Sequence, residues 1–228
     1  MKNILEIKDL TKKYRDGNRQ VTALDKVTFT LSEGEDLAIL GTSGSGKTTL
    51  LQLAGGLDNR TSGEVVVNGK SLSRMNDREI SDFRNRTMGF IFQMINLQTF
   101  LSAKDNIKIP ALLMGVKNSE AEKRSIELLA KFGLKDRESH LPSELSGGEQ
   151  QRVAVARAII NNPKIIFADE PTGRLDKENA ESIIAILEEL SHERGMSVVM
   201  ITHDEKIAQR FSRVIRLEKG RIITDSKY

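Results

Sequence analysis

Short apolar runs alternate with longer amphipathic stretches along this chain, a pattern typical of a mixed α/β fold. Several of the short runs are continuously apolar, which favours strands that are buried on both faces of a sheet. The segments predicted as strands are residues 4–10, 27–31, 37–40, 64–67, 88–92, 165–168, 197–201 and 213–217. The predicted central sheet is therefore mostly parallel, because helical patterns separate the buried strands.

Helical patterns fill much of the remaining chain. The predicted helices are residues 47–54, 77–85, 120–132, 147–161, 177–194 and 204–211. In segment 177–194 the apolar side chains recur at steps of three and four residues, so they line one face that can pack on a sheet. These side chains are Ala180, Ile183, Ile184, Leu187 and Leu190.

The stretch from about residue 97 to residue 161 differs from the sequence on either side. It is mostly helical and contains no convincing strand, whereas strands and helices alternate before and after it. We expect one domain in which residues 1–92 and 162–228 form the α/β core. Residues 93–161 then form an inserted helical subdomain.

An additional antiparallel layer is predicted beside the parallel sheet. Segments 1–35 and 62–70 are rich in strand-forming residues and dotted with charges. A hairpin at 217–224, which turns at Gly220, has the same character. Alternating strands joined by tight turns are typical of antiparallel sheets, so we assign all three segments to that layer.

Composition excludes several classes of protein. The chain has 228 residues, of which 38% are hydrophobic and 29% charged, so it can form one large domain with a sizeable core. It has no apolar run of the roughly 18–20 residues that a membrane span needs, and its beginning has no apolar core of an export signal. Because cysteine is absent, disulfides and thiolate metal sites are excluded. A net charge of +3 and 4% aromatic residues argue against a nucleic-acid partner.

A glycine-rich loop joins the strand at 37–40 to the helix that follows. Its residues are Gly41, Thr42, Ser43, Gly44, Ser45, Gly46, Lys47 and Thr48, followed by Thr49. The glycines let the backbone curl until several N–H groups face one anion, and the helix adds its positive N-terminal end. Lys47 can then reach the β- and γ-phosphates of a nucleotide, while the Thr48 hydroxyl can ligate Mg²⁺. The alternative is an ordinary turn rich in glycine and serine.

A pair of carboxylates follows the buried strand at 165–168. Carboxylates at the carboxyl edge of a parallel strand lie in the crevice where such sheets bind ligands. Asp169 is the candidate for the Mg²⁺ site, directly or through water, and Glu170 can accept a proton from the attacking water or orient it. A solvated acidic pair before a proline turn is the alternative, which the glycine-rich loop makes much weaker.

A second candidate anion site lies at the start of the helix at 147–161. Its residues are Leu145, Ser146, Gly147, Gly148, Glu149 and Gln150, followed by the helical run 151–158. Ser146 is a good N-cap, and the two glycines leave backbone N–H groups open at the helix start. An ordinary capped helix would explain Ser146 but not two glycines in the first turn.

Together with the glycine-rich loop, this sequence resembles the signature of the nucleotide-binding subunits of ATP-binding-cassette (ABC) transporters. The resemblance implies a P-loop NTPase fold with a RecA-like core, and hydrolysis of ATP with Mg²⁺. It also implies a head-to-tail homodimer, in which ATP binds between the loop of one chain and Ser146, Gly147 and Gly148 of the other. Lys47 and Glu170 are then catalytic residues, and ATP binding closes the dimer.

The resemblance assigns roles to four further residues. Gln93 resembles the Q-loop glutamine, which touches the metal or the attacking water, and His203 resembles the switch histidine that senses the γ-phosphate. Asp176 resembles the D-loop aspartate that crosses the dimer interface; it can instead cap the next helix, or serve in both roles. Tyr14 resembles the aromatic residue that stacks on adenine, or it is a core contact. In this D-loop, residues 173–176, Arg174 stands where related proteins carry a small or amide residue, so we expect it to alter dimer closure or to make a specific contact.

Three further segments resemble one branch of the family, which includes lipoprotein-release, macrolide-export and antimicrobial-peptide-resistance ATPases. They are residues 89–93, 109–116 and 168–173. This likeness implies a separate integral-membrane permease as partner, an export or mechanotransmission role, and a location on the cytoplasmic side of the cell membrane. The uncharged segment 87–103 is the candidate docking groove for the permease, and its candidate apolar contacts are Met94, Ile95, Leu97 and Phe100. Alternatively, these side chains only pack the helical insertion.

Two other functions compete with the transporter subunit. The first is a soluble ABC ATPase of DNA repair or translation. Such proteins carry very long coiled coils or two cassettes in one chain, whereas this chain holds a single cassette. The second is a small P-loop kinase, which would leave the Ser146 sequence unexplained. The sequence therefore favours the transporter subunit.

Overall fold

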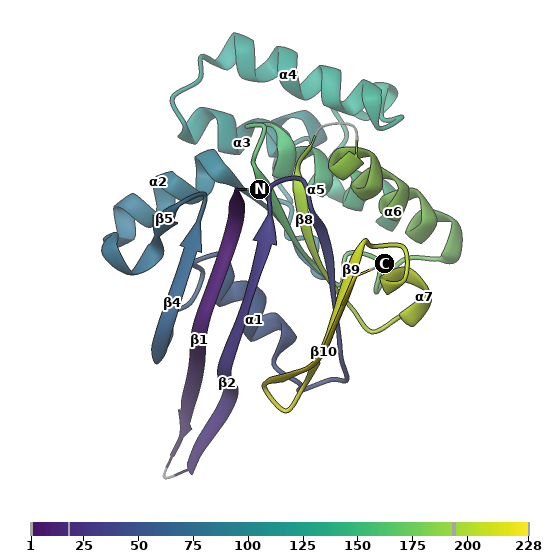
Figure 1. Cartoon of the computed structure of the whole chain (residues 1–228). Helices are drawn as coiled ribbons and strands as arrows, with labels where there is room; N and C mark the ends of the chain where they lie inside the picture. Colours follow the sequence, from purple (N-terminus) through teal and green to yellow (C-terminus); the bar gives the residue numbers. More distant parts are fainter. Residues whose placement is uncertain (1, 18, 193–194, 228) are drawn as a thin grey trace.

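The computed structural model describes residues 2–17, 19–192 and 195–227, which form two sheets and the helices around them (Figure 1). The larger sheet has the strand order β10-β9-β3-β8-β7-β6 and the smaller one β2-β1-β4-β5. The strands are β1 (Asn3–Asp16), β2 (Arg19–Ser32), β3 (Asp36–Leu40), β4 (Ser62–Val67), β5 (Lys70–Ser71), β6 (Met88–Ile91), β7 (Ile165–Asp169), β8 (Ser197–Thr202), β9 (Arg213–Glu218) and β10 (Arg221–Lys227). The helices are α1 (Lys47–Ala54), α2 (Asp77–Thr87), α3 (Ala103–Leu113), α4 (Asn118–Lys131), α5 (Gly147–Ile159), α6 (Lys177–His192) and α7 (Glu205–Ala208). The predicted mixed α/β fold is confirmed.

The centre of the larger sheet is parallel, as predicted. Strands β3, β8, β7 and β6 run side by side in the same direction. Their register places Leu40 opposite Thr202, and Ile91 opposite Ala168. The loops that follow these strands therefore leave the sheet at one edge, which is where parallel sheets bind ligands.

Alternate residues of the buried strands enter two different hydrophobic cores. In β7, Ile165 and Phe167 pack with α1 and the antiparallel sheet. Ile166 and Ala168 point to the opposite face and pack with the other helices, including α5 and α6. Because successive side chains of a strand point to opposite faces, a fully apolar run is what this three-layer arrangement requires.

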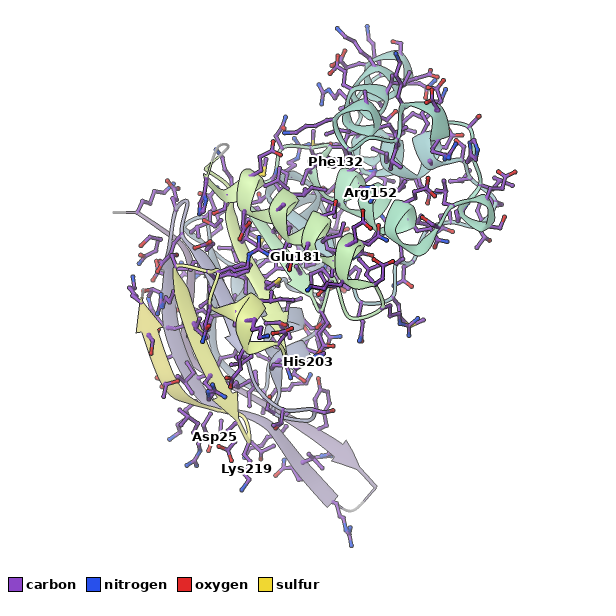
Figure 2. All side chains as sticks on the ribbon, turned by 90° about the vertical axis from the view of Figure 1, so that its right-hand side faces the viewer. Asp25, Phe132, Arg152, Glu181, His203 and Lys219 are labelled. Carbon is purple, nitrogen blue, oxygen red and sulfur yellow. The ribbon has the colours of Figure 1, made fainter. Side chains whose placement is uncertain are left out.

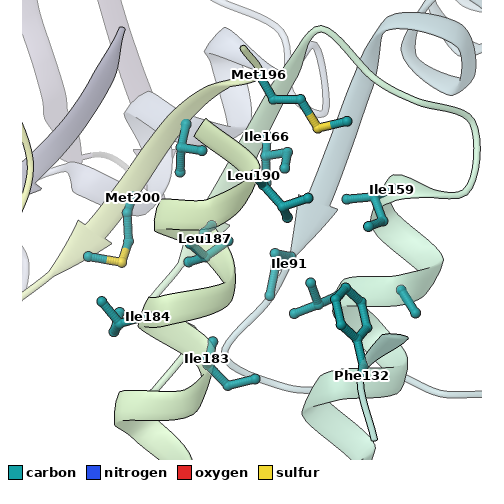
Figure 3. Close-up of a cluster of buried hydrophobic side chains, with 14 of the residues drawn as sticks. Ile91, Phe132, Ile159, Ile166, Ile183, Ile184, Leu187, Leu190, Met196 and Met200 are labelled. Atoms are coloured by element: carbon teal, nitrogen blue, oxygen red, sulfur yellow. The ribbon is translucent and has the colours of Figure 1, made fainter. Parts of the chain in front are cut away.

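Helix α6 covers one face of the central sheet with the apolar stripe that the sequence predicts. Figure 3 shows Ile183, Ile184, Leu187 and Leu190 directed at the sheet, where they meet residues such as Met200. All four α6 side chains are buried. The last two residues of the predicted helix, 193 and 194, lie outside the described residues.

Three helices, α3, α4 and α5, follow one another between β6 and β7, and α4 lies at the end of the molecule far from the β1–β2 hairpin (Figure 1). The bounds of α3 were not predicted, since Pro110 lies inside it and proline disfavours a helix interior. Ser102 caps the helix by accepting a hydrogen bond from the Asp105 N–H. The buried Asn106 amide donates to the carbonyl oxygens of Gln98 and Leu101, which fixes the preceding loop.

The C-terminal hairpin belongs to the larger sheet, so its predicted place in the antiparallel layer is wrong. Strand β9 pairs in parallel with β3, and β10 continues the sheet as its edge. Helix α7 provides the crossover that parallel pairing needs. The buried Ile215 and Leu217 tie β9 to the core. The turn at Gly220 lies where it was predicted.

Within the part of the chain that the structure describes, no helix is long and apolar enough to cross a bilayer.

Candidate functional site

The glycine-rich loop leads directly from β3 into α1, whose first turn has open N–H groups. Gly46 is the N-cap and has a left-handed backbone, with φ 103°. It has no side chain with which to accept a hydrogen bond, whereas Ser102 and Ser146 cap α3 and α5 with their hydroxyl groups. The donors of the first turn of α1 are therefore available to an anion from outside the helix.

Two glycines of the loop are required by close neighbours. A Cβ at Gly46 would collide with the carbonyl oxygen of Ala23 in β2. A Cβ at Gly41 would collide with the carbonyl oxygen of Leu217 in β9. The loop is thus enclosed by β2 and β9, and its curled shape depends on residues without a side chain.

Polar groups inside the loop fit a phosphate chain. The ammonium group of Lys47 is buried and donates to the carbonyl oxygens of Gly41 and Thr42, at 2.8 and 2.9 Å. The buried hydroxyl of Ser45 has no hydrogen-bond partner among the described residues. Among the described residues, the Lys47 ammonium is held only by these backbone carbonyls, and the Ser45 hydroxyl is unpaired. Both groups would gain hydrogen bonds from an incoming anion.

The loop opens into a cavity of about 540 Å³ at the carboxyl edge of the sheet. Its described lining consists of Val21, Thr22, Ala23, Ser43, Gly44, Gly46, Lys47, Thr48, Thr49, Gln93, Asp169, Glu170 and His203. The cavity thus joins the loop to the polar residues that follow β6, β7 and β8.

Thr48 and Asp169 meet at this edge. The Thr48 hydroxyl donates to the Asp169 carboxylate at 3.3 Å. Burial raises the pKa of Asp169, and the charge of Glu170 adds to this, while the Thr48 hydrogen bond and Lys47 oppose it. A hydroxyl and a partly buried carboxylate are hard oxygen donors, and Mg²⁺ usually combines one or two such protein ligands with phosphate oxygens. These residues therefore fit a magnesium ion that arrives with a nucleotide.

Glu170 lies between Gln93 and His203. The side-chain amide of Gln93 donates to one carboxylate oxygen at 3.1 Å, and Nδ1 of His203 lies 3.4 Å from the other. The backbone of Glu170 is left-handed, with φ 42°, which is uncommon for a residue with a side chain. Such conformations cluster at functional sites.

Tyr14 lies in β1 and is 38% exposed. Its hydroxyl donates to the Asp58 carboxylate at 2.8 Å, and the Lys12 ammonium lies 4.6 Å from the ring centre. Burial is the main cause that raises the Tyr14 pKa. The sequence reading did not identify Asp58, because it follows α1 and meets Tyr14 only in the fold.

Ser146 is the N-cap of α5, where Ser146 and Glu149 cap each other's backbone N–H groups. The Glu149 N–H donates to the Ser146 hydroxyl at 3.3 Å, and the Ser146 N–H donates to the Glu149 carboxylate at 2.8 Å. The hydrogen bond from Ser146, followed by that from Arg137, lowers the pKa of Glu149 to about 2. Ser146 and Gly147 are exposed, so this helix start faces away from the core.

The two candidate phosphate surfaces are separate in one chain. Ser146, Gly147, Gly148 and Asp176 do not belong to the described lining of the cavity at the glycine-rich loop. Figure 2 shows Arg152, on the helix that Ser146 caps, in the helical part of the molecule, and His203 well away from it. The structure brings together the loop, Asp169, Glu170, Gln93 and His203, but not the signature.

Asp176 lies at the start of α6, and its carboxylate accepts hydrogen bonds from the backbone and the side chain of Asn179. Both bonds lower its pKa. The hydrogen bond from the Asn179 backbone N–H caps α6, which is the second role that the sequence allows for Asp176. The sequence reading did not identify Asn179, and only its position three residues after Asp176 signals the contact.

Comparison with known proteins gives matches over nearly the whole chain. A family model described as "ABC transporter" matches residues 24–173, which include the loop, Gln93, Ser146 and Glu170. The "Macrolide export ATP-binding/permease protein MacB" of Hyphomonas neptunium is 46% identical over 98% of this chain, which spans 34% of that relative's length. The "Lipoprotein-releasing system ATP-binding protein LolD" of Geobacter metallireducens is 44% identical over 99% of this chain and 100% of its own.

A solved structure is similar over the same length. It is described as the "Dimeric structure of a post-hydrolysis state of the ATP-binding cassette MJ0796 bound to ADP and Pi". It is 39% identical, has a TM-score of 0.92, and the match covers 98% of each chain. The likeness therefore includes both candidate phosphate surfaces and the helices between them.

Proposed function

We propose a head-to-tail dimer for this chain, which belongs to the ABC transporter family and is an ATP-binding and ATP-hydrolysing subunit. Two copies close over two molecules of MgATP and thereby drive a separate permease. One observation carries this proposal: each chain has two surfaces suited to phosphate, and they lie apart. A nucleotide bound in the loop of one chain can meet a Ser146 surface only on a second chain. The dimeric state of the similar cassette supports this arrangement.

In the proposed site, the loop of one chain binds the phosphates. The open N–H groups of α1 and the Ser45 hydroxyl donate to phosphate oxygens, and Lys47 exchanges its two carbonyl partners for them. Ser146 of the second chain approaches from the other side, with its hydroxyl and the N–H groups of the α5 N-terminus. The contacts from both chains then resist opening until the phosphates are separated.

Thr48 and Asp169 would hold Mg²⁺, and Gln93 would reach the metal or the attacking water. When bound, the ion neutralises charge on the β- and γ-phosphates. Glu170 accepts the proton of the attacking water. Gln93 and His203 orient the two carboxylate oxygens of Glu170. His203 is 67% exposed, so it remains free to meet the γ-phosphate. Tyr14 would stack on adenine.

The permease surface proposed here is an apolar groove of about 410 Å³ next to the Gln93 loop. It lies between α2, β6, α3 and α5, with Phe90, Phe92 and Leu113 among its walls. Leu113 is 76% exposed, which is unusual for a large apolar side chain. Phe100, a candidate contact from the sequence, is 75% exposed but does not belong to the described lining of this groove. Of the candidate contacts, Leu97 packs against the helical core, so the alternative reading holds for that residue.

An apolar helix of an integral-membrane permease is the partner that we propose for this groove. Residues 93–161 would then move as a helical subdomain against the core of residues 1–92 and 162–228 when ATP binds. The relatives' names support an export or release system, and the full-length match to LolD supports a permease on a separate chain. The chain would lie on the cytoplasmic face of the membrane, held there by its partner.

Capture from membranes tests the partner. The chain carrying a tag is mixed with detergent-solubilised membranes of the cells that make it, and bound proteins are identified by mass spectrometry. We expect a multi-span membrane protein that is retained by the unchanged chain and by Ile223→Asp, a control at an exposed apolar residue of β10. Leu113→Asp should lose this partner but keep ATP hydrolysis by the free chain. Co-purification of DNA or ribosomes instead would contradict the proposal.

A further inference from the structure

The side chain of Asn179 lies between the D-loop, which ends at Asp176, and α5, the helix that begins at the Ser146 signature. Its amide nitrogen donates to Asp176 Oδ2 at 2.8 Å, while its backbone N–H donates to Asp176 Oδ1 at 2.9 Å. Its amide oxygen accepts from the guanidinium of Arg152 on α5, at 3.2 Å. The Asn179 amide thus donates to the D-loop through Asp176 and accepts from α5 through Arg152.

Gly148 makes room for this side chain. A Cβ at position 148 would collide with Oδ1 and Cγ of Asn179. At Gly147 the nearest atom to an added Cβ is Leu175 Cδ2, at an ordinary 3.9 Å. Within the chain, therefore, Asn179 explains the second glycine of the signature, whereas the first is left open towards the outside.

A second contact holds α5 to the same segment. The side chain of Gln151 is buried, with 2% exposed, and its amide donates to the carbonyl oxygen of Pro171 at 2.8 Å. The segment from Pro171 to Asp176 is therefore tied to the signature helix near both of its ends.

The segment from Pro171 to Asp176 begins directly after Glu170, the proposed general base. Pro171 directly follows Glu170, and a Cβ at Gly173 would lie 3.1 Å from the amide nitrogen of Gln93 and 3.5 Å from Glu170 Oε2. One end of the segment thus packs against the residues that act on the chain's own nucleotide. The other end holds the helix start that, in the proposed dimer, acts on the nucleotide of the second chain.

We infer that Asn179 is a positioning residue that locks the signature N-terminus to the D-loop, so that both enter the second chain's site as one rigid unit. The inference rests on the proposed head-to-tail dimer. Asn179 does not line the described cavity at the glycine-rich loop, so it acts through Asp176 and the start of α5 and not on the nucleotide in its own chain. It also connects the state of Glu170 in one site to the signature that serves the other site.

Two substitutions separate the two contacts. Asn179→Ala removes both, whereas Asn179→Asp keeps the shape and the acceptor for Arg152 but places a carboxylate against that of Asp176. Glu178→Ala, at the exposed neighbouring position in the same helical turn, is the matched control. All three are made in a Glu170→Gln parent, which we expect to hold the ATP-bound dimer without turnover, and thermal unfolding of each is measured.

The readouts are ATP affinity of the dilute monomer by calorimetry and the dimer dissociation constant by analytical ultracentrifugation with MgATP. For both Asn179 variants we expect monomer ATP affinity within about twofold of the parent and dimerisation weakened at least about tenfold, the size of one lost charge-assisted contact. A role only in folding would lower thermal stability without this split. Unchanged dimerisation, or a matching loss of monomer ATP affinity, would overturn the inference.

Mixed chains test that the effect acts on the second chain's site. Asn179→Asp chains mixed with Lys47→Ala chains contain one site with an intact loop and an intact signature. We expect such mixtures to dimerise with ATP better than either variant alone. Mixtures of the Asn179→Asp/Lys47→Ala chain with the parent have, in each heterodimer, the intact loop opposite the altered signature. Because the parent also pairs with itself, the two chains of each mixture carry different fluorescent labels and only heterodimers are counted, by energy transfer. Heterodimers of this second mixture should form poorly; equal heterodimer formation in the two mixtures would overturn the inference. A parent that stayed monomeric would contradict the proposed function, and the inference with it.

Discussion

The side-chain amide of Gln93 donates to the Glu170 carboxylate at 3.1 Å, although the two residues follow different strands of the parallel sheet. This hydrogen bond joins the loop at the apolar groove to the carboxylate at the end of β7. A shift of the Gln93 loop would therefore change the orientation of the proposed general base. In the proposed complex, this contact is a direct route from a permease helix in the groove to ATP hydrolysis.

Replacing Glu170 by glutamine should stop hydrolysis without loss of ATP binding. Glutamine keeps the shape of the side chain but cannot accept the proton of the attacking water. A general base contributes typically about 10²- to 10⁴-fold, so kcat should fall by at least about 10²-fold. Phosphate release measures kcat, and Glu181→Gln on the exposed side of α6 is the control. Turnover within a few-fold of the unchanged chain would rule out Glu170 as the base.

Replacing Lys47 by alanine should weaken nucleotide binding itself. The ammonium group is buried in the loop and would make charge-assisted hydrogen bonds to phosphates. One such contact is worth about 1.5–3 kcal/mol, so calorimetry should show ATP affinity reduced by about 10- to 100-fold. Lys123→Ala, at an exposed position of α4, is the control. Equal affinities of the two variants would show that Lys47 does not contact the phosphates.

Tyr14 offers a direct spectroscopic test of adenine stacking. The chain has no Trp and two Tyr, so in a Tyr228→Phe background the tyrosine fluorescence reports Tyr14 alone. We expect ATP to quench this fluorescence and inorganic tripolyphosphate, which has no base, to leave it unchanged. Tyr14→Ala should weaken ATP binding by about 1–3 kcal/mol and tripolyphosphate binding hardly at all, whereas Tyr14→Phe should bind both normally. Equal losses for both ligands would argue against stacking.

Stability should depend on pH through Glu149 at the α5 cap. Its pKa is lowered from 4.5 to about 2 in the fold, so the ionised carboxylate stabilises the protein at neutral pH. This contribution is present above about pH 4.5 and is lost as the pH falls towards 2. Glu149→Gln should lower the free energy of unfolding by about 1 kcal/mol at pH 7, a typical value for a helix cap. Urea unfolding at several pH values should show this difference shrinking in acid; a constant difference would mean that the charge of Glu149 is not involved.

The spacing of apolar residues predicted most helices and strands, because the buried positions follow that spacing closely. Helix α1 has the predicted bounds to the residue, and the apolar face of α6 is evident from residue spacing alone. Helix α3 was not delimited, since the sequence around Pro110 gives a local signal against a helix that tertiary packing overrides. The C-terminal hairpin was recognised as a hairpin, but a turn signal does not say which sheet the hairpin joins.

The candidate site residues were identified by motifs, and the structure places Gln93, Glu170 and His203 within hydrogen-bond reach or close to it. Asp58 and Asn179 were not identified, because each matters through a contact made only in the fold. The sequence also gave no sign of the left-handed backbone of Glu170, because glutamate seldom adopts that conformation. Motifs thus indicated the groups proposed to perform the chemistry but not those that hold them in place.

The most direct test is the mass of the Glu170→Gln chain in solution with and without nucleotide. If ATP binds between the loop of one chain and the Ser146 surface of another, light scattering after size exclusion should give the mass of a single chain without nucleotide. It should give twice that mass with MgATP, and Ser146→Arg should prevent the doubling while leaving ATP affinity of the monomer intact. A chain that binds ATP yet remains monomeric at every concentration, even with its membrane partner present, would contradict the account.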